Sequence, residues 1–251
     1  MKVLKTRRTS RKNKKMVVQV FQINAEKVLN PKKLYLKREL KKCDFGVAIF
    51  GSARIPESDP IYKDTFELAK GVGEMGLDLI TGGGPGLMEA ASKGHQAGDK
   101  DGKAHSIGLN IILPFEQKPN ESLDAVSNHE RFSTRLDDFM LLSNVVVVMP
   151  GGVGTCLEFF YTWQLIQVKH VCRIPVILVG EMWRQLIFWA IDNPLKDGYL
   201  DAKDMESIDV VDEASEALEV IKKAKKHHEE LGPDVCVNWK EYGKHFKNGV
   251  S

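Results

Sequence analysis

The sequence predicts an α/β fold with a doubly wound, mostly parallel, Rossmann-like sheet, helices on both faces and a single domain of this kind. Short apolar runs alternate with amphipathic segments along the chain. Runs that are apolar throughout are typical of parallel strands covered on both faces. Two glycine-rich turns each follow such a strand and precede a helix, which is where α/β sheets bind ligands. The composition, 43% hydrophobic and 28% charged over 251 residues, excludes wholesale disorder.

The elements follow from this alternation in order along the chain. The predicted strands are 45–50, 77–81, 106–113, 145–149, 175–179 and 208–211. The predicted helices are 60–75, 87–97, 130–142, 156–168, 183–191 and 213–228. Asp59 and Pro60 mark the first helix start, because aspartate caps helices and proline fits their first position. Residues 114–128 are predicted to be a connection with one short strand. The helix at 156–168 is apolar nearly all round, so we expect it to be buried, with one face meeting a second subunit.

The charge is distributed unevenly along the chain. Residues 1–42 contain 15 Lys and Arg and 2 Asp and Glu, whereas residues 43–251 contain 21 and 32. We therefore expect a basic N-terminal extension at 1–42, with a short strand at 17–23 and a short helix at 31–42, and a Rossmann-like domain at 43–251. The composition of residues 1–15 favours a solvated tail. RNA binding is the alternative, although no aromatic side chain is present there to stack on bases.

Several classes of protein are excluded or disfavoured. The longest apolar runs are far shorter than the roughly 18–20 residues that span a membrane, and the N-terminus lacks the apolar stretch of a secretory signal. The four cysteines form no CxxC pair, and no Cys/His cluster is present, so we expect reduced cysteines, a cytoplasmic location and no metal site. We expect no cofactor and no membrane partner.

The two glycine-rich turns indicate an anion site. The first is Thr81-Gly-Gly-Gly-Pro-Gly-Leu-Met-Glu89 and the second is Pro150-Gly-Gly-Val-Gly-Thr-Cys-Leu-Glu158. Glycines let the backbone approach a ligand, and the helix N-terminus offers free N–H groups, a combination that usually binds phosphate. The alternative is that the glycines only make tight turns. Neither loop is a Walker motif or a GxGxxG at the first strand, which disfavours nucleotide hydrolases of that class and dinucleotide binding.

Two charged residues are the candidate reactive groups. Arg135 lies on a helix that leads into the 145–149 strand, and a helix followed by a strand returns to the same rim of the sheet. Arg135 and Glu158 are therefore expected to converge on one pocket. The alternatives are a capping box between Thr155 and Glu158, and a salt bridge of Arg135 with Asp137 or Asp138.

These residues also carry a resemblance to a known family. The second loop fits PGGxGTxxE, the signature of the LOG ("Lonely Guy") family, and three blocks resemble the family's other motifs in the same order. The blocks are Phe50-Gly-Ser-Ala-Arg54, Thr81-Gly-Gly-Gly-Pro-Gly-Leu-Met-Glu-Ala-Ala91 and Ile107-Gly-Leu-Asn-Ile-Ile-Leu-Pro-Phe-Glu-Gln117. The likeness covers roughly residues 45–225. Members were long labelled lysine decarboxylases, but nothing in this sequence suggests a lysine in a setting for pyridoxal phosphate.

The resemblance implies the site and the activity. The family consists of cytokinin riboside 5′-monophosphate phosphoribohydrolases and related nucleoside-monophosphate nucleosidases, which implies an AMP-like substrate and a homodimer. Its catalytic Arg and Glu correspond to Arg135 and Glu158, although Leu136 stands where many members have lysine. The residues expected to bind phosphate and substrate are Gly51, Ser52, Gly82, Gly83, Gly84, Met88, Glu89, Gly151, Gly152, Gly154 and Thr155.

The hypothesis is therefore hydrolysis of the N-glycosidic bond of a purine or cytokinin nucleoside 5′-monophosphate to the free base and ribose 5-phosphate. In the alternative hypothesis the chain binds or carries a phosphorylated ligand, such as molybdenum cofactor, without hydrolysing it. Similar glycine loops occur in such carriers. Retention of both the arginine and the glutamate favours the hydrolase.

Overall fold

The computed structural model describes residues 45–113 and 118–231. Within them, seven strands form one parallel sheet in the order β4-β3-β2-β1-β5-β6-β7. The strands are β1 (Gly46–Phe50), β2 (Asp78–Thr81), β3 (Ser106–Ile111), β4 (Ala125–His129), β5 (Val145–Val148), β6 (Val176–Val179) and β7 (Ile208–Val211). The predicted doubly wound sheet is confirmed, and β4 is the short strand expected in the connection. The predictions for residues 1–44, and with them the boundary after residue 42, lie outside the described residues.

The helices alternate with the strands as predicted. They are α3 (Pro60–Glu74), α4 (Leu87–Gly98), α5 (Phe132–Leu142), α6 (Val153–Gln167), α7 (Glu181–Ala190), α8 (Ala202–Met205) and α9 (Ala214–Leu231), with a π-helical turn η2 (Ile191–Leu195) after α7. The Asp59 side chain caps α3 by accepting a hydrogen bond from the Ile61 N–H at 2.9 Å. Neither η2, which contains Pro194, nor α8 was predicted.

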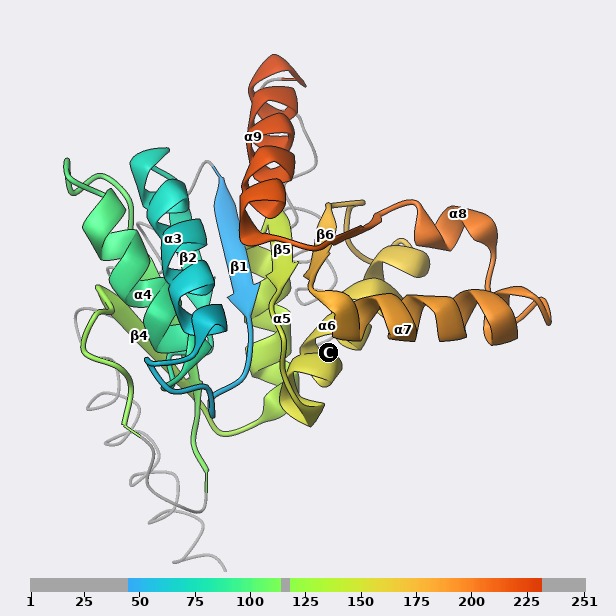
Figure 1. Cartoon of the computed structure of the whole chain (residues 1–251), viewed down its shortest axis with the longest axis horizontal. Helices are drawn as coiled ribbons and strands as arrows, with labels where there is room; N and C mark the ends of the chain where they lie inside the picture. The colour runs from blue at the N-terminus through green and yellow to red at the C-terminus, as the bar shows by residue number, and fades with distance from the viewer. Residues whose placement is uncertain (1–44, 114–117, 232–251) are drawn as a thin grey trace, which may run out of the picture. The chain divides into compact units, whose positions relative to one another are not determined.

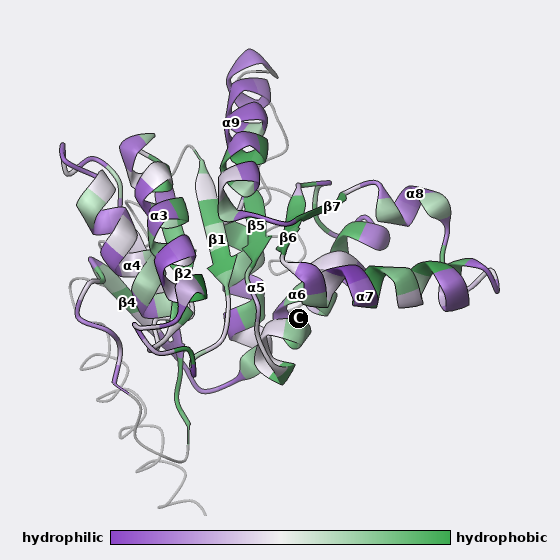
Figure 2. Cartoon of the chain, viewed as in Figure 1, coloured by the Kyte–Doolittle hydropathy of each residue, from purple (hydrophilic) through white to green (hydrophobic). Residues whose placement is uncertain are grey.

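The two faces of the sheet are covered by different helices (Figure 1). Val47 and Ile49 of β1 belong to the core beneath α3, α4 and α9, whereas the next residue, Phe50, packs edge-on against Phe139 of α5 at 4.9 Å between ring centroids. Because successive side chains of a strand point to opposite faces, an apolar strand serves both layers. Figure 2 colours the central strands mainly as hydrophobic, and the residues of β1 and β5 are buried along their whole length.

The chain reverses its direction across the sheet between β1 and β5, which are neighbours. Strands β2, β3 and β4 extend from one side of β1, and β6 and β7 extend beyond β5. The loops after β1, β2 and β5 meet at the carboxyl ends: the Ser52 N–H donates to the Pro150 carbonyl at 3.2 Å, and the Leu87 N–H donates to the Ser52 carbonyl at 2.9 Å. Such a reversal point is the usual ligand site of a doubly wound sheet.

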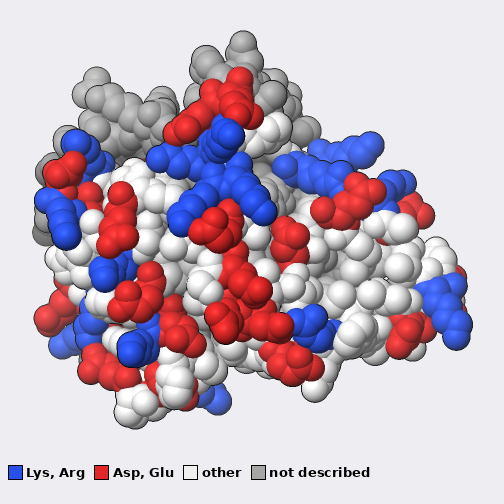
Figure 3. Space-filling model, turned by 45° about the horizontal axis from the view of Figure 1, so that its top comes forward, with Lys and Arg blue, Asp and Glu red and all other residues white. Residues whose placement is uncertain are grey.

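The surface of the described residues carries both signs of charge. Figure 3 shows lysine and arginine side chains beside acidic ones over the face drawn. On α9, for example, Lys222 pairs with Glu219 at 2.6 Å. The face drawn in Figure 3 is therefore not uniformly positive.

No helix among the described residues is long and apolar enough to cross a membrane. The expectation of reduced cysteines is wrong for Cys172, which is disulfide-bonded, whereas Cys156 is free.

Candidate active site

Arg135 and Glu158 form an ion pair at the carboxyl ends of the strands. Arg135 comes from the first turns of α5 and Glu158 from the second turn of α6, and each residue is 8% exposed. The distance between Arg135 Nη1 and Glu158 Oε1 is 3.2 Å. The structure thus brings together the two residues that the sequence placed at one rim. The alternative partners of Arg135 are engaged elsewhere, since Tyr161 Oη donates to Asp137 at 2.5 Å and Asp138 pairs with His129 at 3.5 Å.

The guanidinium of Arg135 is fixed from several sides. Its Nε donates to the Leu109 carbonyl at 2.6 Å, and its Cζ lies 5.3 Å from the centre of the Phe139 ring. Gly82 lies directly against it, because a Cβ added at Gly82 would be 2.2 Å from Arg135 Nη2. Glycine is required at this position for the side chain of Arg135 to occupy its place.

Burial changes the proton affinity of both groups. It raises the pKa of Glu158 from 4.5 to about 7, although the positive charge of Arg135 acts in the opposite direction. Burial also lowers the pKa of Arg135, and Glu158 opposes this change. Arginine remains protonated in proteins. Glu158 is therefore the group of the pair that can gain or lose a proton near neutral pH.

The first glycine loop joins β2 to α4 through two glycines with left-handed backbone. Gly83 has φ +72° and Gly86 has φ +67°, and a Cβ at Gly86 would lie 2.5 Å from the Ser52 carbonyl oxygen. The Gly83 N–H donates to Thr81 Oγ1 at 3.1 Å. The loop therefore turns sharply while it packs against the loop that follows β1.

The second glycine loop leaves the N-terminus of α6 open. Helix α6 begins at Val153, with Gly152 as its N-cap and no capping hydrogen bond from a side chain. The predicted start at Cys156 and the Thr155–Glu158 capping box are therefore wrong. Gly152 and Gly154 are exposed, and a Cβ added at either would meet nothing within 4 Å. Their N–H groups lie at a helix end, where an anion is favoured.

Thr155 lies behind this open turn as the third residue of α6. Its side chain lies over Gly151, where a Cβ would be 2.2 Å from Thr155 Oγ1, and Thr155 is 4% exposed. Gly151 is therefore needed for close approach, whereas Gly152 and Gly154 leave space above the helix end.

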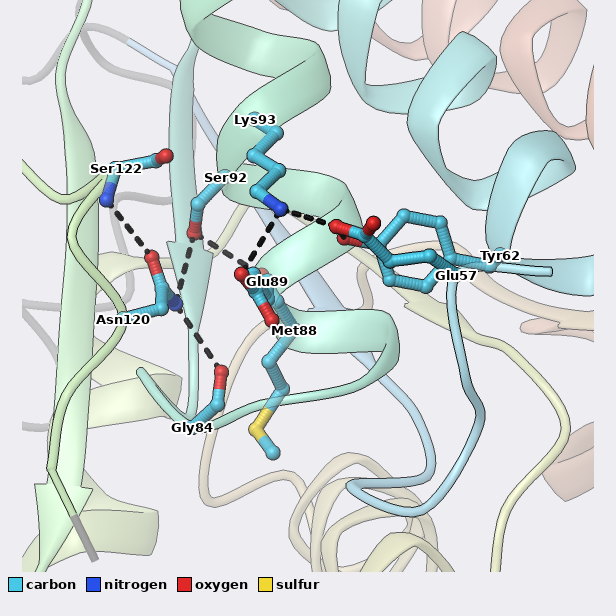
Figure 4. A network of polar contacts seen from close by, with 9 residues as sticks. All are labelled: Glu57, Tyr62, Gly84, Met88, Glu89, Ser92, Lys93, Asn120 and Ser122. Carbon is cyan, nitrogen blue, oxygen red and sulfur yellow. Dashed lines mark hydrogen bonds and ion pairs between the residues drawn. The ribbon is translucent and has the colours of Figure 1, made fainter. Parts of the chain in front are cut away.

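The remaining predicted site residues surround the first turn of α4. The Met88 sulfur lies beside Gly82, since a Cβ there would be 2.6 Å from it. The Glu89 carboxylate is already paired with Lys93 Nζ at 3.0 Å, and Lys93 also contacts Glu57 (Figure 4). Glu89 is thus near the site but belongs to an ion-pair cluster of the structure itself.

Sequence reasoning missed Asn120, which binds the first glycine loop. Its side-chain N–H groups donate to the Gly84 carbonyl at 3.1 Å and to Ser92 Oγ at 3.4 Å. Asn120 lies 36 residues beyond Gly84, and the one local signal was an asparagine after proline in the 114–128 connection. Within residues 45–113 and 118–231, no group of three or more His, Cys, Asp or Glu residues could hold a metal ion.

Comparison with known proteins places this site in a family. A family model described as "Possible lysine decarboxylase" matches residues 88–221, which include both members of the ion pair. The chain belongs to this family, the LOG family. The LOG-family match begins in the first turn of α4 and ends in α9, and so covers most of the sheet and the second loop.

Relatives of this LOG-family chain include an enzyme and several solved structures. The pyrimidine/purine nucleotide 5′-monophosphate nucleosidase of Escherichia coli strain K12 is 25% identical over 204 residues, which are 77% of this chain but 44% of that protein. The chain thus corresponds to less than half the length of this curated relative.

Two solved structures share the fold. TM1055, a structural genomics target, is 26% identical with a TM-score of 0.54, over 71% of this chain and 99% of that one. The molybdenum cofactor carrier protein of Chlamydomonas reinhardtii is 22% identical with a TM-score of 0.53, over 72% of this chain and 98% of that one.

Proposed function

We propose that this protein hydrolyses the N-glycosidic bond of a nucleoside 5′-monophosphate, releasing the free base and ribose 5-phosphate. The observation that carries the proposal is the buried Arg135–Glu158 pair, which lies at the reversal point of the sheet together with the open N-terminus of α6. The Glu158 carboxylate of the pair suits a reaction that develops positive charge, and the open N-terminus of α6 suits a phosphate. The nucleosidase name of the E. coli relative supports the same reaction class.

The proposed reaction divides the work between the second glycine loop and the Arg135–Glu158 pair. The N–H groups of 152–155 and the Thr155 hydroxyl hold the 5′-phosphate and so fix the ribose. As the bond to the base breaks, positive charge develops on the anomeric carbon, and the ionised Glu158 carboxylate stabilises it. Water adds to that carbon and gives one proton to Glu158, while the departing base takes one proton from solvent. Glu158 then releases its proton to solvent, so that the products are the neutral base and ribose 5-phosphate. Arg135 orients Glu158 and contributes positive charge near the anionic substrate, because arginine does not act as an acid.

A substrate panel tests this proposal. Purified protein is incubated with AMP, GMP, CMP, IMP and isopentenyl-AMP, and free base and ribose 5-phosphate are quantified. We expect both products in equal amounts from at least one monophosphate, none from adenosine, and loss of activity on the order of a hundredfold or more in Glu158→Gln. The panel also establishes whether a plain purine or a cytokinin base is preferred. Absence of both products from every monophosphate contradicts the proposal.

The second candidate function is carriage of a phosphorylated ligand. The fold shared with the molybdenum cofactor carrier of C. reinhardtii favours it, because the open N-terminus of α6 would bind a phosphorylated pterin as well as a nucleotide. Pterin absorbance and fluorescence in the purified protein, together with an inactive substrate panel, would favour carriage over hydrolysis.

A homodimer is part of the proposal and is supported by apolar residues at the surface of α6 and α7. Leu157 and Phe160 of α6 are 43% and 40% exposed, and Phe188 and Trp189 of α7 are 56% and 53% exposed. Side chains of this kind are typical of subunit interfaces. Sedimentation of a dimer that dissociates in Phe160→Glu supports this, whereas a monomeric wild-type protein contradicts it. A cytoplasmic location likewise remains our proposal.

A further inference from the structure

Asn120 connects the segment before β4 to the first glycine loop and to the second turn of α4. Its backbone N–H donates to the Gly83 carbonyl at 2.9 Å, and its side-chain amide donates to the Gly84 carbonyl at 3.1 Å. The same amide nitrogen lies 3.4 Å from Ser92 Oγ, on the far side of the first turn of α4. Figure 4 shows the Asn120 side chain between Gly84 and Ser92.

The geometry of Asn120 is itself held in place. Its Oδ1 accepts a hydrogen bond from the Ser122 N–H at 3.2 Å, which is the local turn typical of asparagine. Ser92 Oγ in turn donates to the Met88 carbonyl at 3.0 Å. The amide of Asn120 therefore has a defined direction, and its contacts reach the helix as well as the loop.

The loop that Asn120 holds has little stiffness of its own. Residues 82–84 are three consecutive glycines, and glycine has the largest backbone freedom of any residue. Ordering one residue costs on the order of 1–2 kcal/mol of backbone entropy. Hydrogen bonds to the Gly83 and Gly84 carbonyls fix these peptide planes before any substrate arrives, and they keep both carbonyl oxygens engaged with Asn120.

The position of this loop is transmitted to the ion pair through Gly82. The backbone at Gly82 is so close to Arg135 Nη2 that even a methyl group there would overlap the guanidinium. Arg135 in turn contacts Glu158 at 3.2 Å. A loop that moves toward Arg135 displaces the guanidinium, and a loop that moves away leaves it room to turn from Glu158. Enzymatic rates fall when the reacting groups are displaced from their productive geometry.

We infer that Asn120 is a positioning residue for the Arg135–Glu158 pair, acting through the Gly82–Gly84 loop. The inference rests on the proposed hydrolysis. It predicts an effect on the chemical step rather than on binding of the phosphate, because Asn120 contacts the first glycine loop, whereas the phosphate is assigned to the second.

Two variants of Asn120 and one matched control test the inference. Asn120→Ala removes all side-chain contacts. Asn120→Asp keeps the shape and the oxygen that accepts from Ser122 but cannot donate to the Gly84 carbonyl when ionised, so it replaces the alanine variant if that one does not fold. The control is Asn144→Ala, since Asn144 Oδ1 accepts from the Gly46 N–H at 2.9 Å at the opposite, amino end of the strands. Each protein is measured for kcat and KM on the best monophosphate and for its urea midpoint.

We expect both Asn120 variants to lower kcat about tenfold with KM within about threefold of wild type, and Asn144→Ala to lower the urea midpoint with kcat unchanged. A rise in KM with unchanged kcat, wild-type kinetics in both Asn120 variants, or an equal loss of kcat in Asn144→Ala overturns the inference alone. A wild-type protein that hydrolyses no monophosphate overturns the proposed function and this inference with it.

Discussion

Replacing Glu158 with glutamine is expected to raise the unfolding free energy of the protein and to abolish the proposed hydrolase activity. Glu158→Gln keeps the shape of the side chain and makes it permanently neutral. In the folded protein burial raises the pKa of this carboxyl from 4.5 to about 7, so the folded state holds a proton that the unfolded state has released. The contribution of Glu158 to stability is therefore complete below pH 4.5 and is lost as pH rises through 7.

The size of the effect follows from the same two pKa values. Relative to a neutral side chain at this position, ionisation of Glu158 lowers the unfolding free energy by about 3 kcal/mol at pH 8.5 and by less than about 1 kcal/mol at pH 5. The attraction of Arg135 is already included in the pKa of Glu158. We expect Glu158→Gln to exceed wild type by about 3 kcal/mol in unfolding free energy at pH 8.5, or roughly 6–12 °C in Tm.

Urea unfolding of both proteins at pH 5 and pH 8.5 measures this difference. Glu219→Gln is the control. Glu219 is an exposed carboxylate whose pKa is lowered by its hydrogen bond to Lys222 on α9, so it is mainly ionised from pH 5 to pH 8.5, and its loss should leave the pH dependence of stability over this range nearly unchanged. A glutamine variant of Glu158 that is less stable than wild type at pH 8.5, or whose advantage is the same at both pH values, would refute the assignment of a desolvated carboxylate.

Three further results are expected. The kcat/KM for a monophosphate should rise as pH passes through about 7, since Glu158 acts as the ionised carboxylate; a flat profile between pH 5 and 8 contradicts this. Gly86→Ala should lower the unfolding free energy by about 1–3 kcal/mol in urea titrations, because φ is +67° and the Ser52 carbonyl leaves no room for a Cβ; an unchanged midpoint contradicts this. Thr155→Val should raise KM for the monophosphate about tenfold with kcat nearly unchanged, and a fall in kcat alone would contradict a phosphate contact.

The parts of the fold that the sequence predicts are those set by local pattern. β-Branched apolar runs such as Val145–Val148, bounded by a glycine-rich turn, favour buried strands, and Asp59-Pro60 is typical of a helix start. The proximity of Arg135 and Glu158 could also be predicted from the sequence, because the βα alternation brings helix starts to one edge of the sheet.

The parts that could not be predicted depend on contacts between distant segments. The start of α6 at Val153 follows a Pro-Gly-Gly turn that has no helical signal of its own, so the Thr155–Glu158 spacing suggested a cap that does not form. The hydrogen bonds of Asn120 to Gly84 and the pairing of Lys93 with Glu57 each span 36 residues. Periodicity carries no information about such pairs.

The burial of Glu158 links its proposed catalytic role to its cost in unfolding free energy. A carboxylate that faces a developing positive charge is most effective where water is excluded, and the same exclusion disfavours its ionised form before substrate binds. Arg135 offsets part of this cost and is itself held by the Leu109 carbonyl and by the absence of a side chain at Gly82.

The measurement that tests the central claim most directly is the product analysis of the wild-type protein with AMP, using Glu158→Gln alongside. The predicted result is adenine and ribose 5-phosphate in equal amounts from wild type and essentially none from the variant. Adenosine and inorganic phosphate as products, or equal product formation by both proteins, would contradict a nucleosidase built on the Arg135–Glu158 pair.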